Sequence, residues 1–465
     1  REASRCRIYP RKTMRLRKTI TTIVATAILL AGWQLFAVIA NQPELIPSLP
    51  RLVRTLCEWL VSGSFYQSVG ATILRGVLGM SISFVCAIGM AGLFARFEWV
   101  YELFRPLLAI MRSIPVISFI LLALIFLNPE SIPLMIAFLT MFPLLTENLT
   151  RGILDLRPGL SIMARQFHIR RSNVLFQIIY PQLKPFLYSG LASAAGFGWR
   201  AIIMGEVLSQ CAFGIGSEMK RAQNFIAVPE LLAWTIVAVF ISFFFDKGIS
   251  KVADITPKIS FANEDQTIPT PTLSVLDTKD ISYQYGIQHF SHSFQKGIIY
   301  GISAPSGKGK TTLLNLIGGI LLPTEGEIHP TRHFGIATIF QQPQLLPHLT
   351  AEENIILPLS SFLTEEKARR IAQKHLQEME MEPFGNRYPK ELSYGQQQRI
   401  AIARALASPS PLLLMDEPFK GLDEALSHRI IERIREKQMK EERIILFTSH
   451  NPDEIRLLAD EVIYL

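Results

Sequence analysis

The sequence contains little cysteine. Four of its 465 residues are cysteine, and they stand far apart in the chain, at Cys6, Cys57, Cys86 and Cys211. They form no Cys-x-x-Cys pair and have no histidine series nearby. The sequence therefore predicts neither a disulfide framework nor a zinc site.

Acidic residues are scarce in the first half. Residues 1–250 hold 24 Lys or Arg and 12 Asp or Glu, a net charge of +12, whereas residues 251–465 hold 23 and 27, a net charge of −4. The chain's net charge of +8 would suit a nucleic-acid binder, but the excess lies entirely in the more apolar half. We therefore attribute it to membrane topology and expect no nucleic-acid partner. Such length and uneven composition predict more than one domain.

Six runs in the first half are long and apolar enough to cross a bilayer, since a spanning helix needs about 20 residues. They cover residues 20–40, 68–94, 106–127, 131–149, 186–208 and 230–248. Pro115, Pro133 and Pro143 lie inside runs, as is typical of membrane helices. A cleavable signal peptide is the alternative for the first run, but that run exceeds the usual apolar core of about 7–15 residues. We predict an all-α, six-helix transmembrane domain over residues 20–250.

Basic residues predict the orientation of these spans. A basic leader, residues 1–19, precedes the first run. Its first thirteen residues lack periodicity, and we expect those thirteen to be loosely structured. Six crossings place both chain ends on the leader's side, together with segments 95–105 and 150–185, which are richer in Lys and Arg than the opposite segments. The positive-inside rule makes that side cytoplasmic.

Five charged residues lie within or near the predicted spans: Arg75, Arg112, Glu147, Arg200 and Glu206. Such a charge either faces a substrate path or gate, or reaches from a helix end to the membrane surface. Arg75, Arg112 and Glu147 lie near the ends of runs, which favours the second interpretation. For Glu206 the two interpretations are balanced.

Two stretches connect the apolar runs to each other and to the rest of the chain. Residues 161–185 mix apolar and basic residues and end in two prolines, which predicts a short amphipathic helix and a turn into the fifth span. After Phe245 the apolar signal stops, and residues 255–275 contain three prolines and no periodicity. We expect a semi-extended linker over residues 251–272.

Residues 273–465 alternate short β-like runs with helical segments, the pattern of a three-layer α/β domain around a mainly parallel sheet. The stretch "APSGKGKTTLL", residues 304–314, follows one such run and opens a helix, the context of a phosphate-binding loop. Its amides and helix N-terminus would surround a β-phosphate, with Lys310 as a point charge and the Thr311 hydroxyl as a Mg²⁺ ligand. The residues expected to bind the nucleotide there are Ser306, Gly307, Lys308, Gly309, Lys310, Thr311 and Thr312.

A second apolar run, "PLLLMDEP" at residues 411–418, ends in two carboxylates. Asp416 would hold Mg²⁺ through water, and Glu417 would polarise the attacking water, because phosphoryl transfer depends mainly on positioning and charge stabilisation. An acidic pair alone is often only part of a loop. This pair follows a phosphate-binding loop in the chain, which favours the catalytic interpretation.

On these motifs, residues 273–465 resemble the ATP-binding cassette (ABC) ATPases. "LSYGQ", residues 392–396, stands where that family has its signature, with Tyr394 in place of the usual glycine. The resemblance implies that Ser393, Gly395 and Gln396 bind the γ-phosphate of an ATP held by a second cassette, through a helix N-terminus. We expect Tyr394 to be a tolerated variant.

Other residues match motifs of the same family. Gln341 matches the Q-loop glutamine that senses the γ-phosphate through Mg²⁺ and water, Asp423 matches the D-loop, and His450 matches the switch histidine. Tyr285 matches the aromatic residue that stacks on adenine. Tyr283 is nearly as good a match, and a core role for either tyrosine stays open.

The apolar half resembles the permeases of binding-protein-dependent importers for nitrate, sulfonates, taurine and thiamine-precursor pyrimidines. The similar stretches are "LFRPLLAIMRSIPVISFILLALIF" (103–126) and "GLASAAGFGWRAIIMGEVL" (190–208). Ala164 and "IIYP" (178–181) match that family's coupling loop, whereas Ile162 and His168 replace its usual glutamate and glycine.

Together the resemblances imply a six-helix permease followed by an α/β P-loop ABC ATPase domain, working as a homodimer with two interfacial ATP sites. Both termini and the ATPase domain would be cytoplasmic, on a protein embedded in the lipid of the cell inner (plasma) membrane. ATP and Mg²⁺ are the implied cofactors. The implied catalytic residues are Glu417, His450, Lys310 and Gln341, and the implied metal ligands are Thr311, Gln341 and Asp416.

The function implied is import of a small molecule, either a small anion or a small heterocycle of the nitrate, sulfonate, taurine or thiamine-precursor classes. A periplasmic or lipid-anchored substrate-binding protein would deliver it. An exporter is one alternative, but exporter helices extend far into the cytoplasm and the loops here are short. A cassette that binds ATP only for regulation is the other, and the intact Lys310, Asp416, Glu417 and His450 argue against it.

Overall fold

The computed structural model describes residues 11–253, 257–265, 273–284, 286–305, 307–330 and 335–465, with backbone alone for residues 11–19, 22, 23, 252 and 253. The chain divides into two compact units. The helical unit takes its residues from 1–155 and 183–255, and the α/β unit from 156–182 and 256–465. The stretch 156–182 thus lies between two helices of the helical unit in sequence but belongs to the α/β unit in space.

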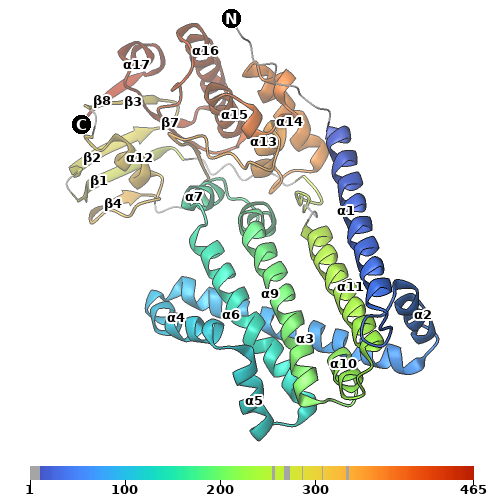
Figure 1. The fold of residues 1–465 in the computed structure, drawn as a ribbon. Coiled ribbons are helices and arrows are strands. Elements are labelled where there is room, and N and C mark those ends of the chain that lie inside the picture. Colours follow the sequence, from blue (N-terminus) through green and yellow to red (C-terminus); the bar gives the residue numbers. More distant parts are fainter. Residues whose placement is uncertain (1–10, 254–256, 266–272, 285, 306, 331–334) are drawn as a thin grey trace, which may run out of the picture. The chain divides into compact units, whose positions relative to one another are not determined.

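The helical unit is built from long helices joined by short turns (Figure 1). Its helices are α1 (Arg11–Ala40), α2 (Leu49–Trp59), α3 (Gly63–Arg96), α4 (Glu98–Ser113), α5 (Val116–Phe126), α6 (Ile132–Leu154), α9 (Tyr180–Ser209), α10 (Ile215–Asn224) and α11 (Val228–Ala253). Because α1 begins at Arg11, residues 11–13, which were expected to be loosely structured, are helical; residues 1–10 lie outside the described residues.

Four helices in the described part of the chain are long and apolar enough to cross a membrane: Gly63–Arg96, Pro129–Leu154, Arg171–Ser209 and Val228–Lys251. The run expected over 106–127 is not one straight helix, because the chain bends by 94° between α4 and α5. Pro115 explains the break: it has no N–H and disfavours helical backbone at Ile114, whose ψ is 129°. In α1 the apolar part is Val24–Ala40.

The core of the helical unit lies between α3, α6 and α9. Ala87 and Ala91 of α3, Met141 and Leu145 of α6, and Ala194 of α9 pack together there. Small residues let the helix backbones approach. A Cβ atom on Gly79 of α3 would lie 2.6 Å from the Cβ atom of Ala137 in α6, and one on Gly205 of α9 would lie 3.1 Å from the Cα atom of Pro133.

The α/β unit contains two sheets. A five-stranded parallel sheet has the order β5-β6-β7-β3-β8, and a three-stranded antiparallel sheet has the order β2-β1-β4. The strands are β1 (Val275–Tyr283), β2 (Ile287–Gln295), β3 (Ile299–Ser303), β4 (Glu325–His329), β5 (Ile336–Ile339), β6 (Leu412–Asp416), β7 (Ile444–Thr448) and β8 (Glu461–Tyr464). The helices of residues 273–465 are α12 (Lys310–Ile317), α13 (Ala351–Leu359), α14 (Glu365–Glu378), α15 (Tyr394–Ala407), α16 (Glu424–Glu441) and α17 (Pro452–Leu458).

The stretch 156–182 shares the core of this unit. It forms α7 (Pro158–Gln166), α8 (Arg171–Asn173) and a π-helical segment (Val174–Ile179) that runs into α9. Leu160, Met163 and Phe167 are buried in the same apolar cluster as Ala337 of β5 and Met415 of β6. The short helix expected within 161–185 is therefore present as α7, and it is part of the α/β unit's core.

Candidate nucleotide site

Four motifs meet at one edge of the five-stranded sheet. β5, β6, β7 and β3 are neighbouring parallel strands, so their carboxyl ends lie side by side. β5 ends two residues before Gln341, β6 ends at Asp416, β7 ends two residues before His450, and β3 leads into the loop 304–309. Residues that are scattered over the second half of the sequence are thereby gathered at a single site.

Lys310, the first residue of α12, contacts the backbone of the loop that precedes it. Gly307 and Gly309 have φ angles of +83° and +89°, which favour glycine, and Gly309 caps the N-terminus of α12. Lys310 is buried, and its Nζ atom donates to the carbonyl of Ala304 at 2.6 Å and lies 3.5 Å from Nδ1 of His450. Lys308 and Thr312 flank this lysine. The loop therefore concentrates positive charge and backbone amides where a phosphate would lie.

Thr311 and Asp416, the two residues expected to hold Mg²⁺, lie side by side. The Thr311 hydroxyl donates to Oδ2 of Asp416 at 2.9 Å, and the Thr448 hydroxyl donates to Oδ1 at 2.8 Å. Asp416 is 7% exposed, and none of the described Lys, Arg and His side chains lies within ion-pair distance of it. A buried carboxylate without a cationic partner fits a bound cation. No cluster of three or more His, Cys, Asp or Glu side chains that could hold a metal ion occurs among the described residues.

Glu417 contacts several of the other side chains at this edge of the sheet. Its φ angle is +47°, and its Oε1 atom lies 3.1 Å from Nε2 of His450 and accepts from Nε2 of Gln341 at 3.3 Å. Partial burial works to raise the pKa of Glu417, but hydrogen bonds from Lys420 and Gln341, together with the charges of Lys420 and His450, outweigh it, so the pKa lies below its usual value. The carboxylate is held ionised and ready to accept a hydrogen bond.

Lys420 belongs to the site but was not predicted from the sequence. Its Nζ atom donates to Oε2 of Glu417 at 3.0 Å, and this contact raises the pKa of Lys420. The spacing of three residues after Glu417, in the turn that follows β6, is the signal that could have identified it. Lys420 is a positioning residue here because it acts through Glu417.

The signature segment begins α15. Ser393 caps this helix: its hydroxyl accepts from the backbone N–H of Gln396 at 3.3 Å, and the Gln396 side chain accepts from the Ser393 N–H at 2.9 Å. A Cβ atom on Gly395 would lie 2.6 Å from the carbonyl oxygen of Gly421, so glycine is required there. Among the described residues, no hydrogen bond or ion pair joins Ser393, Gly395 or Gln396 to the phosphate-binding loop.

Tyr394 is not idle. Its hydroxyl donates to the backbone carbonyl of Gln341 at 2.8 Å. Its ring packs against Gly421, where an added Cβ atom would lie 2.8 Å from Cδ1 of the tyrosine. The residue that departs from the signature pattern therefore connects α15 to the segment after β5 and to the turn after β6.

The remaining predicted residues are placed as follows. Asp423 caps α16 and accepts from the Leu426 N–H at 2.9 Å. Tyr285 and Ser306 lie outside the described residues. Tyr283, the alternative to Tyr285, packs against the core beside β1 and β2.

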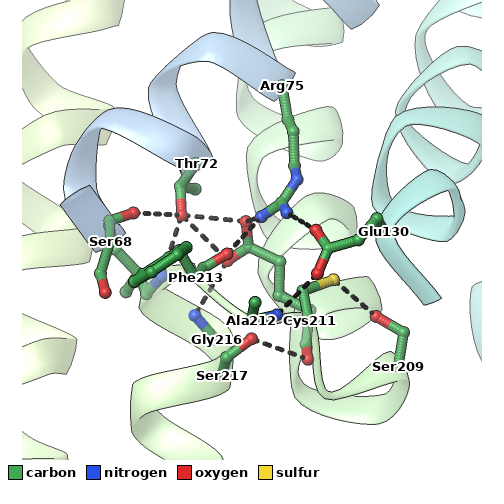
Figure 2. A network of polar contacts seen from close by, with 12 residues as sticks. Ser68, Thr72, Arg75, Glu130, Ser209, Cys211, Ala212, Phe213, Gly216 and Ser217 are labelled. Atoms are coloured by element: carbon green, nitrogen blue, oxygen red, sulfur yellow. Dashed lines mark hydrogen bonds and ion pairs between the residues drawn. The ribbon is translucent and has the colours of Figure 1, made fainter.

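A second polar cluster lies in the helical unit (Figure 2). Glu206 of α9 is fully buried, and it accepts from the Thr72 hydroxyl at 2.9 Å, from Nη1 of Arg75 at 2.7 Å and from the Gly216 N–H at 2.9 Å. Arg75 also donates from Nη2 to Glu130 at 2.5 Å, as Figure 2 shows. The expectation that Arg75 reaches outward from a helix end is wrong: its side chain is 13% exposed and pairs with the buried Glu206 as well as with Glu130, which is 54% exposed.

The other charged residues near the spans differ from this pair. Arg112 and Arg151 both form ion pairs with Glu147. Arg200 lines a groove of about 790 Å³ between α9 and α11 whose other polar lining residues include Thr235 and Asp246. Glu206 is therefore the charged residue with the least contact with solvent among the five considered in the sequence.

Comparison with known proteins identifies both halves. A family model described as "ABC transporter" matches residues 287–420, and one described as "Binding-protein-dependent transport system inner membrane component" matches residues 81–246. An uncharacterized ABC transporter ATP-binding protein from Methanocaldococcus jannaschii is 34% identical over 201 residues, 39% of this chain and 85% of that protein. A thiamine import ATP-binding protein from Yersinia pseudotuberculosis is 34% identical over 205 residues, 41% of this chain and 86% of that protein.

Other similar proteins are longer than the matching region. A Rhizobium etli protein named for Fe(3+) import is 35% identical over 189 residues, 38% of this chain, and the chain spans about half (54%) of its length. A solved dimeric ATP-binding cassette, bound to ADP and Pi after hydrolysis, has 32% identity and a TM-score of 0.39, with 41% of this chain and 94% of that chain covered. The chain belongs to the ABC transporter family and is an integral membrane protein that carries a permease component and an ABC ATPase domain on one polypeptide.

Proposed function

We propose that the chain is an ATP-driven importer whose ATPase domain hydrolyses ATP at the carboxyl edge of the five-stranded sheet. The observation that carries this proposal is the cluster in which Gln341, His450 and Lys420 surround the Glu417 carboxylate beside the phosphate-binding loop. A carboxylate kept ionised next to a site for phosphate is what the activation of water requires.

In this proposal Lys310 and the amides of residues 306–312 bind the phosphates, and Tyr285 stacks on adenine. Thr311, Gln341 and Asp416 hold Mg²⁺, which supplies neutralisation of phosphate charge when bound. Water attacks the γ-phosphorus, the bond to the β–γ bridging oxygen breaks, and ADP and phosphate leave. Glu417 accepts the hydrogen bond and then the proton from that water, and His450 contacts the γ-phosphate.

A homodimer would complete each site. Among the described residues, no hydrogen bond or ion pair joins Ser393, Gly395 or Gln396 to the phosphate-binding loop of the same chain. This arrangement supports a role on the ATP of a second chain, with Asp423 at the same interface. One chain carries one permease component and one cassette. Two chains would therefore supply a pair of permease components and a pair of cassettes. Closing of the two cassettes around ATP would move α7 and switch the permease components between inward- and outward-facing states.

Import with a periplasmic or lipid-anchored binding protein is supported by the permease match and by relatives that are named for import. We propose a small anion or small heterocycle of the nitrate, sulfonate, taurine or thiamine-precursor class as substrate. The protein would lie in the inner (plasma) membrane with both termini and the ATPase domain in the cytoplasm. Stimulation of the reconstituted dimer's ATPase by candidate binding proteins loaded with nitrate, an alkylsulfonate or a pyrimidine tests both the direction and the substrate.

The replacement Glu417→Gln tests the chemistry. It keeps the shape and hydrogen-bonding capacity of the side chain but removes the proton acceptor, so the purified variant should bind Mg·ATP and not turn it over. Glu424→Gln, at an exposed position on α16, is the matched control and should hydrolyse ATP at the rate of the unchanged protein. Undiminished hydrolysis in Glu417→Gln would refute the assignment of the base.

A further inference from the structure

Residues 257–265, which lie within the linker expected from the sequence, contain no helix or strand, and only some of their side chains are partly or fully buried. Ile259 and Phe261 pack against the main core of the α/β unit, and Ala262 is buried. The N–H of Ala262 donates to the carbonyl oxygen of Ser360, the residue after α13, at 3.1 Å. This part of the linker is therefore an element of the α/β unit.

Asn173 joins three segments through one side chain. It is 1% exposed, and its Nδ2 atom donates to the carbonyl of Ser260 at 2.8 Å and to the hydroxyl of Ser360 at 2.8 Å. Its Oδ1 atom accepts from the Ser260 N–H at 2.8 Å. The amide uses both donors and an acceptor, and it pairs with the Ser260 backbone as a neighbouring strand would.

Further contacts hold both ends of residues 257–265. At one end, Nε2 of the buried Gln177 donates to the carbonyl of Pro257 at 3.0 Å. At the other end, Oδ1 of Asp265 accepts from the N–H and the hydroxyl of Thr364 at 3.0 Å each. Residues 170–177 also contact the end of α13 directly, since the Arg170 N–H donates to the Ser361 hydroxyl at 3.0 Å.

We propose that residues 257–265 form a built-in docking segment that holds residues 170–177 against the end of α13 and the start of α14 of the same chain, with Asn173 as the positioning residue. The docking segment would transmit ATP-driven movement to α6 and α9, which adjoin residues 156–182 in sequence. The inference therefore rests on the proposed function. Since the docking segment and both surfaces belong to one polypeptide, their association is intramolecular and independent of protein concentration.

The geometry provides a matched pair of replacements. Ser260 contributes only its backbone N–H and C=O to Asn173, so Ser260→Ala keeps both hydrogen bonds and is the control. Ser260→Pro removes the N–H donor, and Asn173→Leu removes the whole amide at similar volume. If the docking segment acts as inferred, Ser260→Pro and Asn173→Leu share one defect and Ser260→Ala has none.

The test is hydrogen exchange on the full chain in proteoliposomes, with Glu417→Gln as background and Mg·ATP as the added probe. Without ATP, Asn173→Leu and Ser260→Pro should exchange the amides of residues 257–265 about tenfold faster or more, because up to three hydrogen bonds are lost. With ATP, all proteins should gain protection at residues 304–316, but a further change at residues 183–209 should appear only in the background protein and in Ser260→Ala.

The outcomes separate the two proposals. If residues 304–316 gain no protection in any protein, the proposed ATP function fails, whereas the docking is still judged by exchange at residues 257–265 without ATP. If Asn173→Leu and Ser260→Pro exchange residues 257–265 at the rate of Ser260→Ala, or respond to ATP at residues 183–209 as the background does, the docking inference is overturned.

Discussion

The surroundings of Glu417 and of Glu206 can be compared directly, because each carboxylate gathers cationic or polar partners from separate elements. The Glu417 side chain is 15% exposed, and its partners Lys420 and His450 are themselves about half exposed. The Glu206 side chain is fully buried, and both its oxygens accept from groups on two other helices, α3 and α10. The first arrangement leaves room for a ligand to exchange partners, whereas the second is already saturated.

This difference assigns different tasks to similar residues. A buried ion pair contributes little net stability relative to an apolar pair, but loss of one partner is costly because the other charge stays buried. We therefore interpret Arg75 and Glu206 as a joint between α3, α9 and α10, and not as a substrate path. Glu417 and its partners are a reactive site, where a lost group should cost activity more than stability.

The largest effect is expected from breaking the buried joint. Arg75→Met leaves Glu206 and Glu130 without their cation, and we expect a loss of about 3–5 kcal/mol in the free energy of unfolding. Thermal unfolding of the purified protein in detergent measures it. Arg54→Met, at an exposed position on α2, is the control.

A double replacement sharpens this result. Adding Glu206→Gln to Arg75→Met removes the uncompensated buried charge and should recover part of the loss. Equal unfolding temperatures for Arg75→Met and Arg54→Met would mean that the joint does not stabilise the fold.

The next effect is expected in the reactive site. Lys310→Met removes the ammonium group aimed at the phosphates, and ATP hydrolysis should fall by about a hundredfold to a thousandfold, as when one preorganised electrostatic donor is lost. Lys440→Met, on the exposed side of α16, should leave hydrolysis unchanged. If Lys310→Met also lowered the unfolding temperature enough to account for its loss of hydrolysis, the distinction between the two carboxylate clusters would be contradicted.

Lys420 should control the pH dependence of the same site. Its hydrogen bond and charge help to hold the pKa of Glu417 below the usual value. A base must be ionised, so activity is lost as pH falls through that pKa. Lys420→Met removes the hydrogen bond and the positive charge of Lys420, which both lower the pKa of Glu417. The acidic limb of the pH profile of ATP hydrolysis should therefore move to higher pH. An acidic limb identical to that of Lys440→Met would show that Lys420 does not act through Glu417.

The two clusters also differ in how far the sequence could predict them. Lys310, Gln341, Asp416, Glu417 and His450 each follow a recognisable strand, and parallel strands bring their carboxyl ends to one edge. Arg75 and Glu206 are 131 residues apart on different helices. Helical periodicity identifies a buried face but not the helix that packs against it, so this pair could not be predicted.

Two further features, the bend at Pro115 and the docking of residues 257–265, were also not predicted from the sequence. The bend at Pro115 follows from the missing N–H of proline and from its restriction of the backbone at Ile114, and apolar composition alone gives no indication of it. The docking of residues 257–265 depends on Asn173, which lies 87 residues before Ser260. Neither a polar linker nor a lone asparagine predicts such a partner.

Tyr394 should show the smallest effect. The sequence predicts a tolerated variant at this position, and the two contacts of the side chain define how that prediction can be tested. Tyr394→Phe keeps the ring against Gly421 and removes only the hydrogen bond to the Gln341 carbonyl. A bond of this kind is worth about 0.5–1.5 kcal/mol, so ATP hydrolysis should fall by roughly twofold to tenfold if the bond holds Gln341 in place. Tyr394→Gly, which restores the usual signature residue, should lose at least as much because the ring contact is lost too. A rate that rises in both variants would identify the tyrosine as a brake on its own cassette, whereas a rise in Tyr394→Gly alone would assign the brake to the ring and not to the hydroxyl.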